Sequence, residues 1–238
     1  MLRKLLIVFA SGVVLSILAF SAAWLVGGEN FRKEFHEKDG WSWTIDDDGD
    51  QDQGPRKTRA FTVEPGSQIA MEVPVQLTFT RGDKAEMTVE GPAKIIDRLV
   101  WENDRLSIDG NVNMRHGLKV KITAPEISGL DLEAPGDIDL NDLSQDQFNL
   151  TARGAIDLDA NGKVRKVFVA SEGAGDIDLA KVEGEDAVVR VDGAGDVTVG
   201  ATNLVDIEIN GVGHVRLIRK PKTLRSQING IGSVDHDY

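Results

Sequence analysis

Cysteine is absent from this sequence of 238 residues. The chain therefore has no disulfide bond, no cysteine-ligated metal site, no thiol nucleophile and no acylated lipoprotein cysteine. Aromatic residues make up only 5%, so aliphatic side chains must build most of the core. Positive charge is scarce too, because 27 Lys and Arg face 39 Asp and Glu, a net charge of −12. Such a chain repels phosphate backbones, and we expect no nucleic-acid partner.

Motifs of catalysis are also missing. No serine stands in a nucleophile-elbow pattern, and the HExxH pattern of zinc proteases does not occur. The four histidines are scattered along the chain: His36, His116, His214 and His236. We therefore predict that the protein is not an enzyme and has neither catalytic residues nor a cofactor.

One long hydrophobic run is present near the N-terminus. Arg3 and Lys4 precede an uncharged stretch from Leu5 to Gly28, a pattern that predicts an export signal. Ser21-Ala22-Ala23 offers small residues to a signal peptidase, whereas the length of the run suits a transmembrane helix. Cleavage and retention both stay open. In either case we expect the remaining chain to lie outside the cytoplasm, in the periplasm or anchored to the inner membrane through this segment.

The chain divides into three parts. Residues 1–28 are predicted to be a signal peptide or transmembrane anchor, 29–58 an acidic linker, and 59–238 a β domain. The linker is highly charged and lacks sustained periodicity. Its run DDDGDQDQG resembles an EF-hand loop superficially. However, Gln53 stands where the loop needs glycine and Arg59 where it needs glutamate, so we interpret the run as linker.

Short alternating runs fill residues 60–125. MEVPVQLTF and LKVKITAP alternate apolar with polar residues, and glycines separate such runs, as expected for strands and turns. The run IIDRLVW predicts a helical turn that leads into a strand. Arg81-Gly82-Asp83 matches an integrin-binding tripeptide, but such short matches are frequent by chance and a glycine turn between strands explains this one.

A repeat of 18 to 21 residues begins near Ile127, with one marker glycine per unit. Small residues precede each marker by two positions, and β-branched residues follow it by two, so that strands flank a glycine corner. The markers are Gly136, Gly154, Gly175, Gly195, Gly213 and Gly232. This period predicts an all-β, parallel β-helix-like solenoid, preceded by the N-terminal hydrophobic helix. Its stacked rungs would bury Ile138, Ile156, Ile177 and Val197 in one core.

Several segments resemble the head GIN domain family, whose members are described as putative auto-transporter adhesins. They are VWENDRLSIDG, LKVKITAPEISGLDLEAPGDIDL, IEINGVGHV and SQINGIGSV. The resemblance extends over residues 59–238. It implies a right-handed parallel β-helix-like fold in a bacterial envelope protein, and it brings no catalytic residues.

Aspartates that follow the corners are the main candidate site. Asp139, Asp157 and Asp178 stand three positions after their markers and would form a row of like charges on adjacent rungs. Calcium could relieve this repulsion through oxygen ligands, and so could solvent screening. Calcium β-rolls repeat every nine residues, half the period here, which favours solubilising surface charge. The metal site therefore stays unassigned, with these three residues as candidates.

We predict a structural or adhesive role, in which a sheet face binds a polysaccharide or a protein. Two alternatives are a calcium-dependent binding module and a carbohydrate-active enzyme with carboxylates grouped in a groove. An acidic row would repel uronates, and short rungs leave few loops to wall a cleft, which favours binding over catalysis. The carboxylates considered are Asp137, Asp139, Asp157, Asp176 and Asp178. Asn210 and Asn229 are expected to stack as a structural ladder.

Overall fold

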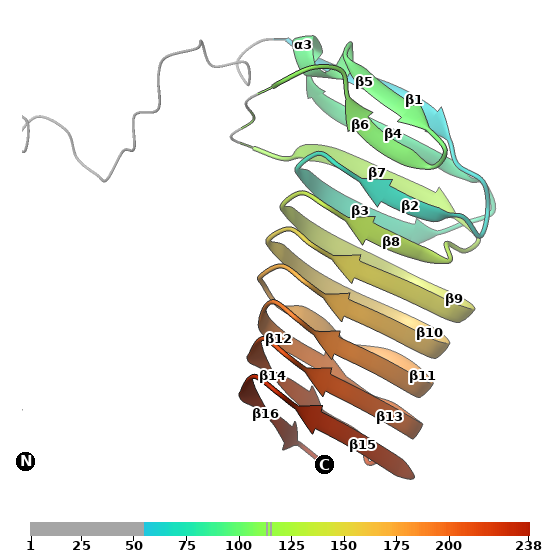
Figure 1. The fold of residues 1–238 in the computed structure, drawn as a ribbon. Helices are drawn as coiled ribbons and strands as arrows, with labels where there is room; N and C mark the ends of the chain where they lie inside the picture. The colour runs from blue at the N-terminus through green and yellow to red at the C-terminus, as the bar shows by residue number, and fades with distance from the viewer. Residues whose placement is uncertain (1–54, 113, 115) are drawn as a thin grey trace, which may run out of the picture. The chain divides into compact units, whose positions relative to one another are not determined.

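The computed structural model describes residues 55–112, 114 and 116–238, which belong to the compact unit Gly49–Tyr238. Its strands pair into one 16-stranded sheet that coils around a single aliphatic core (Figure 1). The predicted β-solenoid is thereby confirmed. The predicted leader, 1–28, lies outside the described residues. Within the described part of the chain, no helix is long and apolar enough to cross a membrane.

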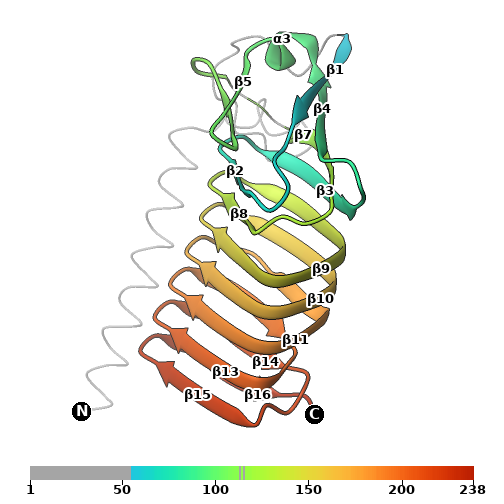
Figure 2. The same cartoon turned by 90° about the vertical axis from the view of Figure 1, so that its right-hand side faces the viewer.

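The body of the solenoid is a stack of parallel rungs. Three long strands, β9 (Gly136–Ala152), β10 (Ile156–Ser171) and β11 (Ile177–Val191), bend midway, so each supplies two arms of a rung (Figures 1 and 2). Later rungs use separate strands for the two arms: β12 (Ala194–Val199), β13 (Ala201–Ile209), β14 (Val212–Leu217), β15 (Thr223–Ile228) and β16 (Ile231–His236). Paired residues lie 17 to 20 positions apart, as in Gly184 with Ala201, Val197 with Val215 and Ile138 with Leu158.

The two arms give the solenoid two faces. Face 1 consists of the arms that follow the glycine corner, namely β3 (Val75–Arg81), residues 136–140, 156–160 and 177–179, β12, β14 and β16. Face 2 consists of the arms that precede the corner, namely β2 (Gln68–Met71), β8 (Gly129–Leu132), residues 148–152, 167–171 and 187–191, β13 and β15. Alternate side chains of both faces point inward.

The N-terminal end of the solenoid is closed by antiparallel strands. β1 (Arg56–Thr62) pairs with β4 (Glu86–Pro92), and β4 pairs with β7 (Leu118–Ala124). β1 thus begins inside the segment that the sequence assigned to the linker. The single helical turn α3 (Ala93–Ile96) precedes the hairpin of β5 (Leu99–Glu102) and β6 (Arg105–Ile108), as the sequence predicted.

Aromatic and aliphatic side chains seal this cap. Ile95 and Ile96 of α3 are fully buried. The ring of Phe61 lies 6.1 Å from that of Trp101, and the guanidinium of Arg59 lies 4.7 Å above the Phe61 ring. Trp101 also donates its indole N–H to the carbonyl of Thr62 at 3.1 Å. The core therefore does not meet water at this end.

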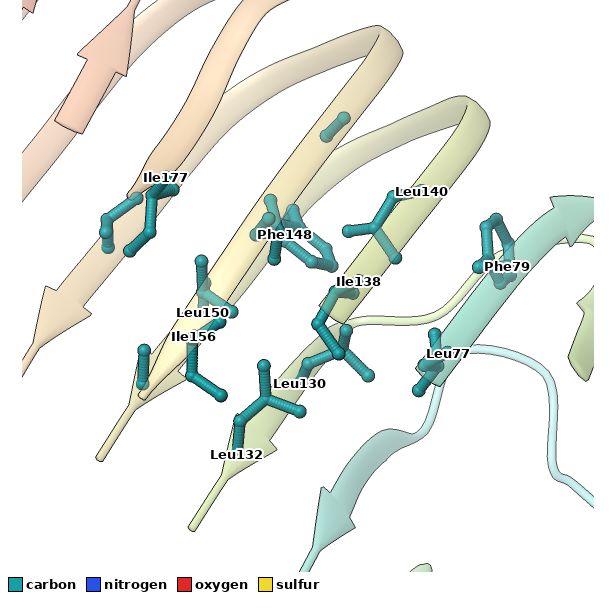
Figure 3. Packing of buried hydrophobic residues seen from close by; sticks show 14 of the residues in the cluster. Leu77, Phe79, Leu130, Leu132, Ile138, Leu140, Phe148, Leu150, Ile156 and Ile177 are labelled. Atoms are coloured by element: carbon teal, nitrogen blue, oxygen red, sulfur yellow. The ribbon is translucent and has the colours of Figure 1, made fainter. Parts of the chain in front are cut away.

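The core consists of aliphatic columns that run from rung to rung. One column joins Leu77, Ile138, Leu158, Ile177, Val197, Val215 and Val234. Figure 3 shows part of it, together with the Phe148 ring between the two arms. The alignment of Gly136 with Gly154 as markers would set Ile156 beside Ile138, and this register is wrong, because Ile156 pairs with Gly136. Both residues are nevertheless buried, as predicted.

The error arises at Gly154, which is not a marker glycine. A Cβ on Gly173 would lie 2.0 Å from the carbonyl oxygen of Gly154, and one on Gly154 would lie 2.4 Å from that of Ala134. Gly154 is therefore equivalent to Ala134 and Gly173, which lie two positions before the marker in their rungs. Ile156 occupies the marker position of its own rung, opposite Gly136. A shift of two residues leaves every side chain on its own face, so the core prediction survives while the pairing changes.

Candidate functional site

Face 1 carries two rows of aspartates on its outer surface. The backbone pairs Asp137 with Asp157, and Asp159 with both Asp139 and Asp178. The predicted row of Asp139, Asp157 and Asp178 is therefore wrong, since Asp157 lies in the neighbouring row. The first row is Asp137, Asp157, Asp176 and Asp196, and the second is Asp139, Asp159, Asp178 and Thr198.

Carboxylates of the first row bind the backbone of the next rung. Asp157 accepts a hydrogen bond from the N–H of Asp176 at 3.4 Å, and Asp176 accepts one from Asp196 at 3.3 Å. Asp196 accepts a third from the N–H of His214 at 3.0 Å. Buried or edge N–H groups need such acceptors, so these side chains have a structural role in joining rungs.

Metal ligation by these rows has no ready-made geometry. In the described part of the chain, no three carboxylates or histidines are arranged to hold an ion. Asp178 instead accepts the N–H of Ala180 at 2.8 Å, within its own strand β11. Calcium binding by Asp139, Asp157 or Asp178 stays a prediction.

A hollow of about 500 Å³ lies where β9, β10 and β11 bend. Four of its five charged residues form ion pairs: Arg165 Nε lies 3.2 Å from Asp146 Oδ1, and Lys163 Nζ lies 3.4 Å from Glu183 Oε2. The hydrogen bond to Asp146 raises the pKa of the Arg165 guanidinium. Glycosidases need two carboxyl groups that flank one bond. The carboxylates considered for that role lie on open face 1 and do not line the hollow.

His214 does not form a catalytic triad with its described neighbours. His214 Nδ1 lies 2.9 Å from Ser233 Oγ, but Asp235 contacts the serine, at 3.1 Å, instead of the imidazole. A triad requires the carboxylate on the other ring nitrogen. His236 Nδ1 lies 3.0 Å from the hydroxyl of Tyr238, and His36 lies outside the described residues.

Face 2 presents an apolar pair on its outer surface. Phe168 and Val188 are direct neighbours on adjacent rungs, and each is 37% exposed. In strands β9 to β16, Phe168 is the one Phe, Tyr or Trp on an outer face. Asn149 lies beside Phe168 on the preceding rung, and Asp206 lies beside Val188 on the next. We name this surface the Phe168 patch: Asn149, Thr151, Phe168, Ala170, Val188 and Arg190.

Polar groups around the patch are held by contacts between rungs. Arg190 donates to Glu208 Oε2 at 2.6 Å, and this bond, followed by one from Asn210, lowers the pKa of the Glu208 carboxyl. Asn229 donates to the amide oxygen of Asn210 at 2.9 Å, which confirms the predicted asparagine ladder. The outer surface of face 2 is therefore ordered and regular.

The patch could have been predicted from two runs of three consecutive apolar residues, which the repeat pattern by itself does not explain. Val167, Phe168 and Val169 are three consecutive apolar residues, as are Ala187, Val188 and Val189. Because side chains alternate along a strand, the middle residue of each trio must point away from the core. The Arg81-Gly82-Asp83 tripeptide begins with the last residue of β3 and leads into the connection to β4, so it lies between two strands as predicted, and Gly82 donates its N–H to the carbonyl of Ala124 at 3.0 Å.

Solved structures resemble this fold. A crystal structure of a putative adhesin from Bacteroides fragilis aligns with a TM-score of 0.63 and 20% identity, over 78% of this chain and 98% of that one. A putative lipid binding protein from Parabacteroides distasonis aligns with a TM-score of 0.40 and 16% identity, over 77% and 97%. The first likeness supports the solenoid fold. A comparison with curated proteins finds no match.

The family model described as "putative auto-transporter adhesin, head GIN domain" matches residues 67–221. This match spans every rung except the last one, β15 and β16, and most of the N-terminal cap, which together are more than half of the chain. The resemblance noticed in the sequence is thereby confirmed. The chain belongs to the putative auto-transporter adhesin, head GIN domain family.

Proposed function

We propose that this protein is a non-catalytic binding module of the bacterial cell envelope, and that the Phe168 patch contacts a neutral polysaccharide. Family membership supports an adhesion or binding role in general. The observation that carries the proposal is the exposed pair of Phe168 and Val188 on a face whose other outer residues are mostly polar. An apolar ring flanked by amide and hydroxyl groups suits a sugar, which offers both C–H faces and hydroxyls.

The charge distribution also favours this face. The outer rows of face 1 hold seven aspartates on four rungs, and such a surface repels acidic polymers. Face 2 mixes signs around the patch, with Lys166 and Arg190 near Asp206 and Glu208. A long polymer that lies across parallel rungs would contact several of them at once, which suits a regular solenoid surface.

Phe168→Ala is expected to weaken binding about tenfold, because an aromatic anchor at the centre of a small interface typically contributes about 1–2 kcal/mol. The measurement is cosedimentation of the full chain with an insoluble neutral glucan, and peptidoglycan sacculi, whose peptides carry carboxylates, serve as the acidic comparison. Val212→Ala is the matched control, since Val212 is 54% exposed but lies near the C-terminal end. The proposal fails if the neutral glucan does not retain the unmodified protein, or if Phe168→Ala and Val212→Ala bind it equally well.

We also propose export, with residues 1–28 as signal or anchor and the solenoid on the far side of the inner membrane. The basic start and the uncharged run from Leu5 to Gly28 support this proposal. The test is the intact mass of the protein from fractionated bacterial envelopes. A mass that includes residues 1–28 in the membrane fraction indicates an anchor, and a shorter one in the periplasm indicates cleavage. Recovery from the cytoplasm would contradict export.

A further inference from the structure

The two ends of the solenoid are built differently. At the N-terminal end, the antiparallel strands β1 and β4 and the Phe61–Trp101 contact cover the first rung. At the C-terminal end, β15 pairs only with β13, and β16 pairs only with β14, among the strands described. The free edges of β15 and β16 therefore present rows of backbone N–H and C=O groups on both faces. Such edges are templates for pairing with another strand.

Apolar side chains at this end are left without cover. Leu224 and Val234 continue core columns but are only partly buried, and Ile228 is 44% exposed although its column partner Ile209 is fully buried. Ile231 begins β16 and is 74% exposed. Two core positions of this rung are polar, Ser226 and His236, which limits the apolar area. At this end the hydrophobic core is therefore incompletely covered, and some of its exposed positions are polar.

Charge changes sign along the solenoid. Residues 126–215 contain six Lys or Arg and nineteen Asp or Glu, whereas residues 216–238 contain five Lys or Arg and two Asp. The strongly acidic middle rungs of two copies would repel each other if they were brought side by side. The last rung does not share this excess of negative charge. Contact between copies is therefore least opposed at the C-terminal end.

We propose that two copies of this chain associate reversibly through their C-terminal rungs. A surface that pairs with both β15 and β16 must itself have two strands with free edges. These strands must be as far apart as β15 and β16 are, and the core between them must be uncovered. In the described part of this chain, the capped N-terminal end does not offer that, and the C-terminal end does. The partner is then the same end of a second copy, and the assembly closes as a two-fold dimer because neither end of the described solenoid is left open.

Charge selects one of the two possible arrangements. When a two-fold axis relates the two ends, their edge strands pair antiparallel in one of two ways. Either β15 pairs with β15 and β16 with β16 of the other copy, or β15 of each copy pairs with β16 of the other. On the outer surface β15 carries Arg225 and β16 carries Asp235, at similar distances from the corner that joins Ile228 to Ile231. Pairing of β15 with β16 places Arg225 beside the partner's Asp235 twice, whereas like-with-like pairing sets equal charges together. We therefore infer the β15–β16 arrangement.

Sedimentation velocity of the full chain in detergent is the first test. The interface is small, so we expect a dimer with a dissociation constant on the order of micromolar. Arg225→Asp and Asp235→Arg should each weaken the dimer at least tenfold, and the double variant should restore it. Far-UV circular dichroism checks that all variants are folded. A monomer throughout, or an association that neither single substitution changes, overturns the proposal.

Cross-linking tests the arrangement itself and is clean because the chain has no cysteine. Protein with Arg225→Cys is mixed with protein carrying Asp235→Cys and oxidised mildly. We expect a disulfide dimer in the mixture and little in either protein alone. Efficient cross-linking of Arg225→Cys by itself would instead indicate like-with-like pairing and overturn the β15–β16 arrangement.

Discussion

Replacement of Phe148 by alanine is expected to lower the free energy of unfolding by about 3–5 kcal/mol. Phe148 is 1% exposed and lies between the two arms of its rung (Figure 3). Its neighbour in the column is Val167 on the next rung, held in place by the parallel ladder. The surrounding strands cannot collapse into the space without breaking that ladder, so a cavity remains. Urea unfolding followed by circular dichroism measures the loss.

Phe168→Ala is the matched control, because it removes the same atoms from the adjacent rung on the opposite side of the sheet. Phe168 is 37% exposed, so its loss leaves no closed cavity and should cost less than about 1 kcal/mol. Equal losses in the two variants would contradict the inward and outward assignment of this arm. A one-residue slip in register would produce that result, since it exchanges the two faces.

Replacement of Gly193 by alanine is expected to destabilise the protein by about 3 kcal/mol, although it adds a single methyl group. A Cβ at this position would lie 1.9 Å from the carbonyl oxygen of Gly173 on the preceding rung. The obstacle is backbone, which cannot rotate away, so the two rungs must separate at the corner. Thermal unfolding of the variant measures the effect as a lower melting temperature.

Gly184→Ala separates this steric effect from the loss of glycine in general. Gly184 lies at the opposite bend, where the nearest atom to an added Cβ is the carbonyl oxygen of Val164 at 3.1 Å. A shift of a few tenths of an ångström accommodates it, so the change in stability should stay within about 1 kcal/mol. If Gly193→Ala were as mild as Gly184→Ala, the close stacking of the glycine corners would be refuted.

Much of the core could be predicted from sequence because strand side chains alternate with a period of two. Ile138, Ile177 and Val197 are buried as expected, and even the misaligned Ile156 points inward. The period near 19 likewise predicted stacked parallel rungs. The candidate site was less predictable. The row of Asp139, Asp157 and Asp178 depended on which residue of one rung faces which residue of the next.

The amino-acid sequence by itself determined the solenoid class, the inward face of each strand and the glycine corners, because these follow from local alternation and from a repeat of nearly constant length. Only the tertiary structure decided the register between rungs. A shift of two residues keeps every inward side chain inward, so the alternation of apolar residues cannot distinguish the two registers. The register is set by backbone contacts at Gly154 and Gly173, because a carbonyl oxygen of the preceding rung lies so close to each that no Cβ fits. That contact places Asp157 beside Asp137 and Phe168 beside Val188.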